Sequence, residues 1–215
     1  MTRESFPIAK PGLIYLLVLA VITGLFFWSF KPASILTGSM LLFTAYFFRN
    51  PRRSIPGDNK AVLSPADGVV MSVSRVHEDK FLHGEATKVS IFLSVLNVHV
   101  NRMPVAGRID YVSYIPGKFL PAFKSHASEI NERNYIGIDS TGLKVLVCQV
   151  TGFIARRIVC YAKCGDWLDR GQHFGMIKFG SCTEIYVPEG IRIMVGPGDR
   201  VRGGETIIGR IPDEN

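Results

Sequence analysis

Cysteine is scarce in this sequence, and its spacing lacks the paired ligands that bind zinc. The chain has 215 residues and four cysteines, none of them in a Cys-x-x-Cys pair. The Cys160/Cys164 spacing has no second pair of ligands, so the sequence predicts no zinc site. We therefore expect reduced, mostly packed thiols in a cytoplasmic domain. The four cysteines are Cys148, Cys160, Cys164 and Cys182.

Signatures of nucleic-acid binding are also missing, although the chain is basic. Its formal charge is +7 and its isoelectric point is near 9.4, which suits either nucleic acid or an anionic membrane surface. No RNA-binding motif and no basic run interleaved with aromatic residues occurs, so a membrane is the better candidate. The 21 glycines and 12 prolines favour short strands and turns over a helical bundle.

Charge is absent from two stretches near the N-terminus. Gly12–Phe30 has no charged residue and as a helix is about one hydrocarbon thickness long. Lys31-Pro32 interrupts it, and Ala33–Phe48 is a second, shorter uncharged run that ends in interfacial aromatic residues. A cleaved signal peptide fits poorly because the second run follows at once. We predict a two-helix transmembrane hairpin with spans of about 12–30 and 33–48, and a buried core helix remains the alternative for the second run.

Basic residues flank this hairpin unevenly. Five lie at its two ends and one, Lys31, lies in the turn, which predicts that both ends are cytoplasmic. We expect residues 1–53 to anchor the chain in the inner cell membrane, and residues 54–215 to form a domain on its cytoplasmic side. The last three basic residues are expected to lie against anionic headgroups, or else in a solvated linker. The five are Arg3, Lys10, Arg49, Arg52 and Arg53.

From about Ala61 the sequence changes to short β-type runs separated by turns. Strands this short and regular predict a mainly β, barrel-sandwich-like domain, with short helical segments at Gly152–Arg157 and Phe123–Arg133. The candidate strands are Ala61–Ser64, Gly68–Val76, Lys88–Leu93, Gly107–Tyr114, Asn134–Asp139, Lys144–Gln149, Cys160–Ala162, Phe174–Phe179, Thr183–Val187 and Glu205–Arg210.

A short pattern occurs twice in the C-terminal half. Gly165–Gly171 and Gly198–Gly204 each open with Gly-Asp and lead to an apolar strand that contains a glycine. This pattern is similar to that of lipoyl- and biotinyl-type hairpin sandwiches, a likeness of fold and not of function. A carrier domain of that type presents a lysine at an exposed hairpin tip. The nearest candidate, Lys178, lies inside an apolar strand pattern, which disfavours a carrier.

A glycine followed by a serine interrupts the apolar stretch Lys178–Pro188. Gly180 leaves its own carbonyl uncrowded, and Ser181 places a hydroxyl one residue downstream of that carbonyl. Attack by the hydroxyl converts the amide to an ester, and elimination with loss of ammonia then leaves a pyruvoyl group on the new N-terminus. The alternative is a glycine bulge in a strand with a solvent-facing serine.

Three earlier segments carry groups that suit proton transfer or anion binding. Asp67 is a candidate base for Ser181 if its carboxylate reaches the hydroxyl. Otherwise it is an ordinary turn residue before Gly68. His99 suits proton transfer near neutral pH, or is a half-buried structural side chain. Arg102 is able to hold a carboxylate or phosphate with two hydrogen bonds. Lys118 and Arg133, in a polar region, are candidates for an anionic substrate head or for a solvated loop.

Together these segments resemble a phosphatidylserine decarboxylase of the short, membrane-anchored bacterial type. The likeness runs in order over almost the whole chain. It rests on the apolar hairpin ending Phe48-Arg49-Asn50-Pro51-Arg52-Arg53, Ser64-Pro65-Ala66-Asp67-Gly68, Asn97-Val98-His99 with Arg102-Met103-Pro104, Pro116-Gly117-Lys118-Phe119, Asn131-Glu132-Arg133-Asn134 and Phe179-Gly180-Ser181.

The resemblance implies a proenzyme that cleaves itself between Gly180 and Ser181. A β chain of residues 1–180 and an α chain of residues 181–215 stay together as a heterodimer, with a higher homo-oligomer left open. Ser181 becomes a covalent pyruvoyl cofactor, without metal or pyridoxal phosphate. Asp67 matches the aspartate that assists serine activation, and His99 matches a family histidine. Larger members carry a second histidine where this chain has Arg102, and Cys182 also departs from the usual residue.

The implied reaction converts phosphatidylserine to phosphatidylethanolamine and CO₂ through a Schiff base on the pyruvoyl group, which accepts the electrons left by CO₂. His99 is our candidate acid for protonating the resulting carbon. Three alternatives stay open: a decarboxylase of another seryl phospholipid such as archaetidylserine, a pyruvoyl enzyme with a soluble substrate, and a membrane-tethered barrel-sandwich adaptor without chemistry. No nucleic-acid partner is expected.

Overall fold

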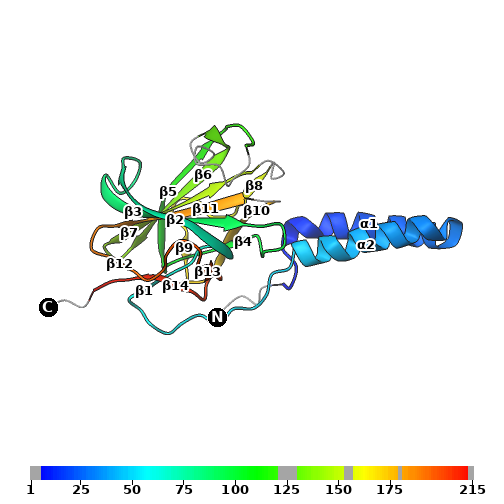
Figure 1. Cartoon of the computed structure of the whole chain (residues 1–215), viewed down its shortest axis with the longest axis horizontal. Coiled ribbons are helices and arrows are strands. Elements are labelled where there is room, and N and C mark those ends of the chain that lie inside the picture. Colours follow the sequence, from blue (N-terminus) through cyan, green and yellow to red (C-terminus); the bar gives the residue numbers. More distant parts are fainter. Residues whose placement is uncertain (1–5, 121–129, 153–156, 179–180, 213–215) are drawn as a thin grey trace. The chain divides into compact units, whose positions relative to one another are not determined.

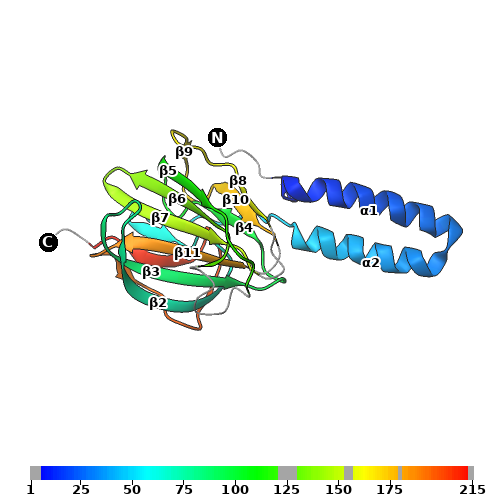
Figure 2. The ribbon, with the colours of Figure 1, turned by 90° about the horizontal axis from the view of Figure 1, so that it is seen from above.

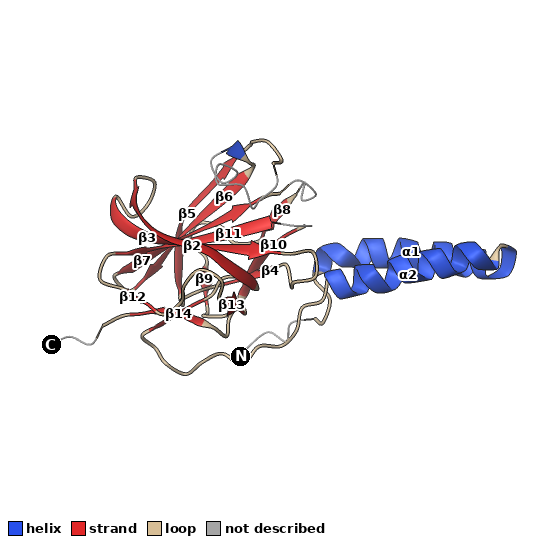
Figure 3. Ribbon diagram, in the orientation of Figure 1, coloured by secondary structure: helices blue, strands red, loops and turns tan. Residues whose placement is uncertain are grey.

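The computed structural model describes residues 6–120, 130–152, 157–178 and 181–212. The chain divides into two compact units, Met1–Arg52 and Arg53–Asn215. The first unit is helical, and in the described part of the second unit the regular structure is almost entirely strand, joined by loops (Figure 3). A mainly β unit that follows an N-terminal helical hairpin in the sequence confirms the predicted fold class.

The helical unit is a hairpin of α1 (Lys10–Ser29) and α2 (Lys31–Phe47), separated by Phe30 alone. Both helices begin at a lysine, earlier than the predicted spans, because each carries its proline in the first turn. Proline is tolerated there since its missing N–H has no partner within the helix. The Lys31-Pro32 pair therefore starts the second helix and does not merely interrupt the first.

Backbone contacts close the open end of this hairpin. The amide of Ala9 donates to the carbonyl of Phe48 at 2.8 Å, and the amide of Asn50 donates to the carbonyl of Pro7 at 2.7 Å. A side chain at Gly12 would overlap the ring of Phe48, so glycine permits this close approach. The two helix ends are thus joined by backbone and by packing.

Among the described helices, α1 is long and apolar enough to cross a bilayer, judged by length and composition. Most of its large apolar side chains are exposed in the unit. The serine and threonine hydroxyls on both helices donate to carbonyls three or four residues earlier, for example Thr23 to Leu19 at 2.7 Å. Bonds of this kind satisfy polar groups that hydrocarbon cannot solvate.

Within the described residues of the second unit, eight strands form one antiparallel sheet in the order β13-β2-β3-β11-β7-β6-β5-β9. The sheet curls around the smaller sheets β1-β14-β12 and β4-β10-β8 (Figures 1 and 2). The strand bounds are β1 Ala61–Leu63, β2 Gly68–Glu78, β3 Gly84–Leu93, β4 Val100–Arg102, β5 Gly107–Ile115, β6 Arg133–Ser140, β7 Leu143–Val150, β8 Ile158–Cys160, β9 Trp167–Leu168, β10 His173–Ile177, β11 Ser181–Pro188, β12 Arg192–Ile193, β13 Arg200–Val201 and β14 Ile207–Arg210.

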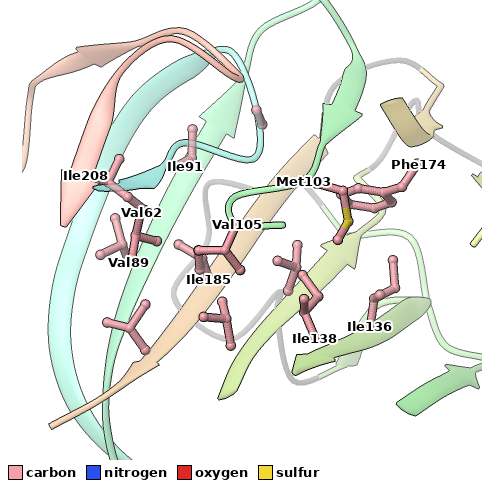
Figure 4. Packing of buried hydrophobic residues seen from close by; sticks show 14 of the residues in the cluster. Val62, Val89, Ile91, Met103, Val105, Ile136, Ile138, Phe174, Ile185 and Ile208 are labelled. Atoms are coloured by element: carbon pink, nitrogen blue, oxygen red, sulfur yellow. The ribbon is translucent and has the colours of Figure 1, made fainter. Parts of the chain in front are cut away.

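The main core fills the inside of the curled sheet. Side chains from its strands meet residues of the two smaller sheets and of the segment after β4 (Figure 4). A second, smaller cluster covers the opposite face of β7 and β11 and includes the buried thiols of Cys148 and Cys182. Burial raises the pKa of both thiols well above the ordinary value. The main cluster includes Val62, Val89, Ile91, Met103, Val105, Ile136, Ile138, Phe174, Ile185 and Ile208.

The sequence repeat is a repeat of structure. Gly165 and Gly198 both have positive φ, 93° and 95°, and each precedes a two-residue strand. The next glycine in each copy with positive φ donates its amide to the other half of the domain, Gly171 to Met103 and Gly204 to Ser64, both at 2.9 Å. Positive φ is freely available only to glycine, which is why both copies need it.

Most predicted strands exist, with bounds that differ by a few residues. The strand expected at Cys160–Ala162 is wrong in position, because β8 ends at Cys160. The short strands β4, β9, β12 and β13 were missed, since two or three residues carry no readable period. The helix expected from Gly152 lies largely outside the described residues, as does most of Phe123–Arg133, where β6 already begins at Arg133.

We expect Ile185→Ala to lower the free energy of unfolding by about 2–5 kcal/mol, because it opens a cavity in the core. Ile185 is 0% exposed and lies in the middle of β11. Urea unfolding in detergent measures this, in a chain carrying Ser181→Ala so that it stays in one piece. Met194→Ala, at a side chain that is 52% exposed, is the control. Equal losses in both variants would contradict this view of the core.

Candidate active site

Ser181 is the first residue of β11, the strand between β3 and β7. It pairs with Leu93 of β3, and alternation along the strand puts its side chain on the same face as core residue Ile185. Ser181 is 0% exposed, which excludes the solvent-facing serine that the sequence left open. Its neighbour Gly180 lies outside the described residues.

Among the described residues, no hydrogen-bond partner reaches the Oγ of Ser181. A buried hydroxyl in this condition costs about 1–3 kcal/mol relative to one that is paired. Native structures rarely keep such a group without a chemical reason. Ser181 therefore stays the candidate nucleophile that the sequence predicts.

A chain of buried amides crosses the domain beside Ser181. Asn101 donates to the Oγ1 of Thr183 at 3.0 Å, two residues along β11 on the same face as Ser181. Gln149 donates to the Oδ1 of Asn101 at 2.9 Å, and Asn134 donates to the Oε1 of Gln149 at 3.0 Å. These polar side chains are 4% exposed or less. The network joins β4, β11, β7 and β6 and holds the start of β11 in register.

Asp67 is held by an arginine and a backbone amide. Two hydrogen bonds of 2.9 and 2.8 Å join its carboxylate to Arg53, and Gly203 donates its amide to Oδ1 at 2.8 Å. The two side chains are 6% and 13% exposed. Within the described part of the chain, none of the hydrogen bonds of Asp67 goes to Ser181. The guanidinium of Arg53 therefore binds the carboxylate of Asp67 and does not face a headgroup surface.

Arg102 lies in the same cluster of charges. Its Nη1 donates to the carbonyl of Gly171 at 3.1 Å, and the residue is 6% exposed. Burial and the charge of Arg53 lower its pKa to about 10, an effect that Asp67 and Glu205 partly oppose. Arg102 thus stands within electrostatic reach of Asp67, in the interior of the domain.

His99 is fully buried just before β4. Its Nδ1 lies 3.0 Å from the carbonyl oxygen of Asn97, and its own carbonyl accepts the amide of Ile177 at 3.2 Å. Because a carbonyl oxygen only accepts, Nδ1 carries a proton, and Nε2 is the basic nitrogen of the neutral ring. The backbone bond ties His99 to a residue four positions before Ser181.

Lys118 and Arg133 belong to a separate region beside β5 and β6. The backbone of Lys118 exchanges hydrogen bonds with Ile130 and Glu132 at 2.8 and 3.1 Å, and its side chain is exposed. Arg133 opens β6, where it is half-buried and pairs with Ile115 and Val150. The structure therefore brings Arg102 to Asp67, and it places Lys118 and Arg133 beside the end of β7, on the side of β11 away from β3.

A hollow of about 350 Å³ opens next to Asp67. Two of its lining residues, Phe92 and Ser94, flank Leu93, the strand partner of Ser181. No sequence pattern indicates this hollow, because its walls come from three distant segments. Its lining residues are Asp67, Gly68, Val69, Phe92, Ser94, Asn97, Arg200, Val201 and Arg202.

Comparisons with known proteins agree on one family. The family model described as phosphatidylserine decarboxylase matches residues 40–209. The chain is 57% identical over 214 residues to the phosphatidylserine decarboxylase proenzyme of Carboxydothermus hydrogenoformans, covering 97% of this chain and 99% of that protein. The chain belongs to the phosphatidylserine decarboxylase family.

Further relatives carry the same name. The proenzyme of Symbiobacterium thermophilum is 48% identical over 99% of this chain and 96% of its own length, and that of Geotalea uraniireducens is 44% identical over 99% and 100%. Membership of the phosphatidylserine decarboxylase family identifies the chain as an enzyme, and the non-enzymatic adaptor is set aside. The family resemblance read from the sequence is confirmed.

The amide network beside Ser181 predicts a specific loss of stability. Asn101→Ala removes the described partner of the Thr183 Oγ1 and of the Gln149 Nε2, which we expect to cost about 1–3 kcal/mol for each group. Urea unfolding in the Ser181→Ala background measures this. Asn59→Ala, at an exposed turn, is the control and should change little. Two indistinguishable unfolding curves would contradict the structural role of the network.

Proposed function

We propose that this chain is a self-processing, membrane-bound decarboxylase that converts phosphatidylserine to phosphatidylethanolamine and CO₂. Family membership supports the reaction, and the relatives named proenzymes support the processing. The observation that carries the proposal is the buried hydroxyl of Ser181, which has no partner among the described residues. The relatives' names favour phosphatidylserine over archaetidylserine, whose headgroup chemistry is the same.

Ser181 supplies the nucleophile of self-cleavage. Its Oγ bonds to the carbonyl carbon of Gly180 while the bond from that carbon to the Ser181 nitrogen breaks, which leaves an ester. Elimination then breaks the bond between Cβ and Oγ and releases Gly180 as a carboxylate. Water replaces the nitrogen, which leaves as ammonia, and residue 181 becomes a pyruvoyl group. The buried, unpartnered hydroxyl fits this role because no described interaction has to be broken first.

Asp67 acts as the base for this step. Its carboxylate is fixed by Arg53 and by the amide of Gly203, so it cannot swing freely. The proton of Ser181 therefore travels to it through a bridging water or through His99. Arg53 is a positioning residue in this scheme, since it holds the carboxylate without touching the reacting atoms.

The two chains produced by cleavage remain associated. Residues 181–215 supply β11, which lies between β3 and β7, as well as β13 against β2 and β14 against β1. Side-chain pairs add to this pairing, including Arg210 with Asp58 at 2.7 Å. Backbone bonds on both sides of a central strand keep the α chain in the heterodimer after the peptide bond is broken.

His99 supplies the proton that completes decarboxylation. A pyruvoyl carbonyl provides the electron sink when CO₂ leaves an amino acid. The Nδ1–H of His99 donates to the carbonyl oxygen of Asn97, so Nε2 is the nitrogen that takes up and delivers a proton. The buried position of the ring excludes bulk water from this transfer.

The helical hairpin anchors the enzyme to the membrane that contains its lipid substrate. The apolar surface of α1 and the internally bonded hydroxyls of both helices support insertion. The excess of basic residues at the two ends supports an inner-membrane location with residues 54–215 in the cytoplasm. Tethering then keeps the site next to headgroups of the inner leaflet.

Intact-mass spectrometry of the purified protein tests self-processing. We expect two chains, with residue 181 at the blocked N-terminus of the smaller one, and activity on phosphatidylserine in detergent micelles. Ser181→Ala should give one chain of 23.8 kDa without activity, because it removes the nucleophile. A single chain of this mass for the unaltered protein, inactive on the lipid, would rule out the proposed function.

Arg53→Gln tests the role of the cluster around Asp67. We expect self-cleavage to slow at least ~10-fold, because losing both bonds to Asp67 frees its carboxylate. The time course of α-chain appearance after cell-free synthesis measures this. Arg52→Gln, at the neighbouring exposed arginine, should cleave at the normal rate.

A purely structural role of Arg53 makes a different prediction. In that case Arg53→Gln would also lower the activity per cleaved chain and the unfolding midpoint. A positioning role leaves the activity of each cleaved chain unchanged, and Arg53→Lys restores part of the cleavage rate. Normal cleavage by Arg53→Gln would contradict the proposed role.

A further inference from the structure

Residues 53–58 lie fixed against the rest of the second unit, and we call this segment the strap. Arg170 donates from Nη2 to the carbonyl of Pro56 at 2.7 Å and from Nη1 to the carbonyl of Asp58. The carboxylate of Asp58 also pairs with Arg210 at 2.7 Å. These contacts hold the C-terminal half of the strap in place.

The N-terminal half of the strap carries Arg53, which binds both carboxylate oxygens of Asp67. The amide of Ser54 donates to Oε1 of Glu205 at 3.1 Å, and the Nη1 of Arg53 lies 3.5 Å from Oε2 of the same carboxylate. Glu205 therefore contacts both the backbone and the arginine side chain of the strap. The next residue along the chain is Ile55.

Ile55 lies over two equivalent glycines of the sequence repeat. A Cβ on Gly171 would overlap the Cδ1 of Ile55, and a Cβ on Gly204 would lie 3.4 Å from the same atom. The Cβ position on Gly204 is also 3.6 Å from the Cα of Gly171 and 3.0 Å from the Cδ of Arg102. The two copies of the repeat thus meet in a notch without side chains of its own. Ile55 fills this notch, although it is 38% exposed on its outer side.

Two arginines and two carboxylates share the site beside the notch. The pKa of Arg102 is lowered by burial and then by the charge of Arg53, whereas Asp67 and Glu205 act in the opposite direction. The two guanidinium groups therefore repel each other, and the two carboxylates balance them. Without Glu205, one carboxylate would face two arginines, and Arg53 would be held less firmly.

We propose that Ile55 and Glu205 are positioning residues that hold Arg53 on the carboxylate of Asp67 during self-cleavage. Ile55 fixes the backbone from which the arginine side chain extends, and Glu205 balances the charges around it. This inference rests on the proposed function, in which Asp67 is the base. It adds residues from outside the motif around Asp67, one of them in the segment that becomes the α chain.

A double-mutant cycle on the rate of self-cleavage tests the role of Ile55. We expect Ile55→Ala to slow cleavage at least ~5-fold, because an empty notch lets the strap and its arginine move. In a chain that already carries Arg53→Gln, Ile55→Ala should slow cleavage by no more than about twofold, since no guanidinium is left to position. The time course of α-chain appearance after cell-free synthesis gives all four rates.

Two further variants complete this test. Ile130→Ala is the matched control, because Ile130 is 40% exposed and lies beside β5 and β6. It should cleave at the normal rate. Ile55→Val keeps most of the side chain in the notch, so it should cleave faster than Ile55→Ala.

Glu205→Gln tests the charge balance. The amide keeps an acceptor oxygen for Ser54 and removes the negative charge. We expect cleavage to slow at least ~3-fold, because Arg102 then repels Arg53 with less compensation. Glu189→Gln removes an exposed carboxylate from the same segment and should cleave normally.

A merely structural role of either residue gives different results. It predicts that Ile55→Ala slows cleavage equally with and without Arg53→Gln, and that both variants lower the decarboxylase activity of each cleaved chain. Positioning of Asp67 for self-cleavage leaves the activity of each cleaved chain unchanged, because the base has then finished its task.

Normal cleavage by Ile55→Ala, or equal slowing in both backgrounds, would overturn the role of Ile55. Normal cleavage by Glu205→Gln would overturn the role of Glu205. If Ile55→Ala shows no unfolding transition in the Ser181→Ala background, the cycle is run with Ile55→Val and judged by the same criteria. Failure of the proposed function is distinct, because the unaltered protein would then stay one chain, and both proposals would fall.

Discussion

The two-sided pairing of β11 is the constraint on which the rest of the domain depends. Ser181 through Pro188 pairs with β3 on one side, and Cys182 through Tyr186 pairs with β7 on the other. This register sends Ser181, Thr183 and Ile185 into the curled side of the sheet. A shift by one residue would move every one of these side chains to the opposite face. The buried hydroxyl, the amide network and the core therefore share one cause.

Charge is organised around this strand in two zones that differ in solvent access. Arg53, Asp67 and Arg102 lie in the interior, where each cation has an assigned oxygen partner. Arg200 and Arg202 lie at the surface of the adjacent hollow. Buried ions are costly unless they are paired, whereas exposed arginines keep their capacity for a ligand. The interior zone is thus already paired, whereas the surface zone is open to solvent.

The sequence predicted those helices and strands that are long enough to leave a recognisable pattern of residues. The uncharged runs predicted both helices, and β-prone runs between turns such as β7 and β11 predicted strands, because runs of about eight residues are long enough to recognise. The two-residue strands β9, β12 and β13 were invisible for the same reason. The repeat built on Gly165 and Gly198 was visible because positive φ restricts those positions to glycine. Within the site, the Gly-Ser pair and the motifs around Asp67 and His99 identified the family.

The sequence by itself determined the family, the helical hairpin and the β class, and it singled out Ser181 as the candidate reactive residue. Only the tertiary structure decided that Arg53 partners Asp67, that Arg102 lies beside them, and that Arg200 and Arg202 border a hollow next to Asp67. A Gly-Ser pair consists of residues adjacent in the chain, so a sequence motif is enough to identify it. Partnerships between distant residues depend on strand register and on the path of the chain, which arise only when the sheet closes around its core.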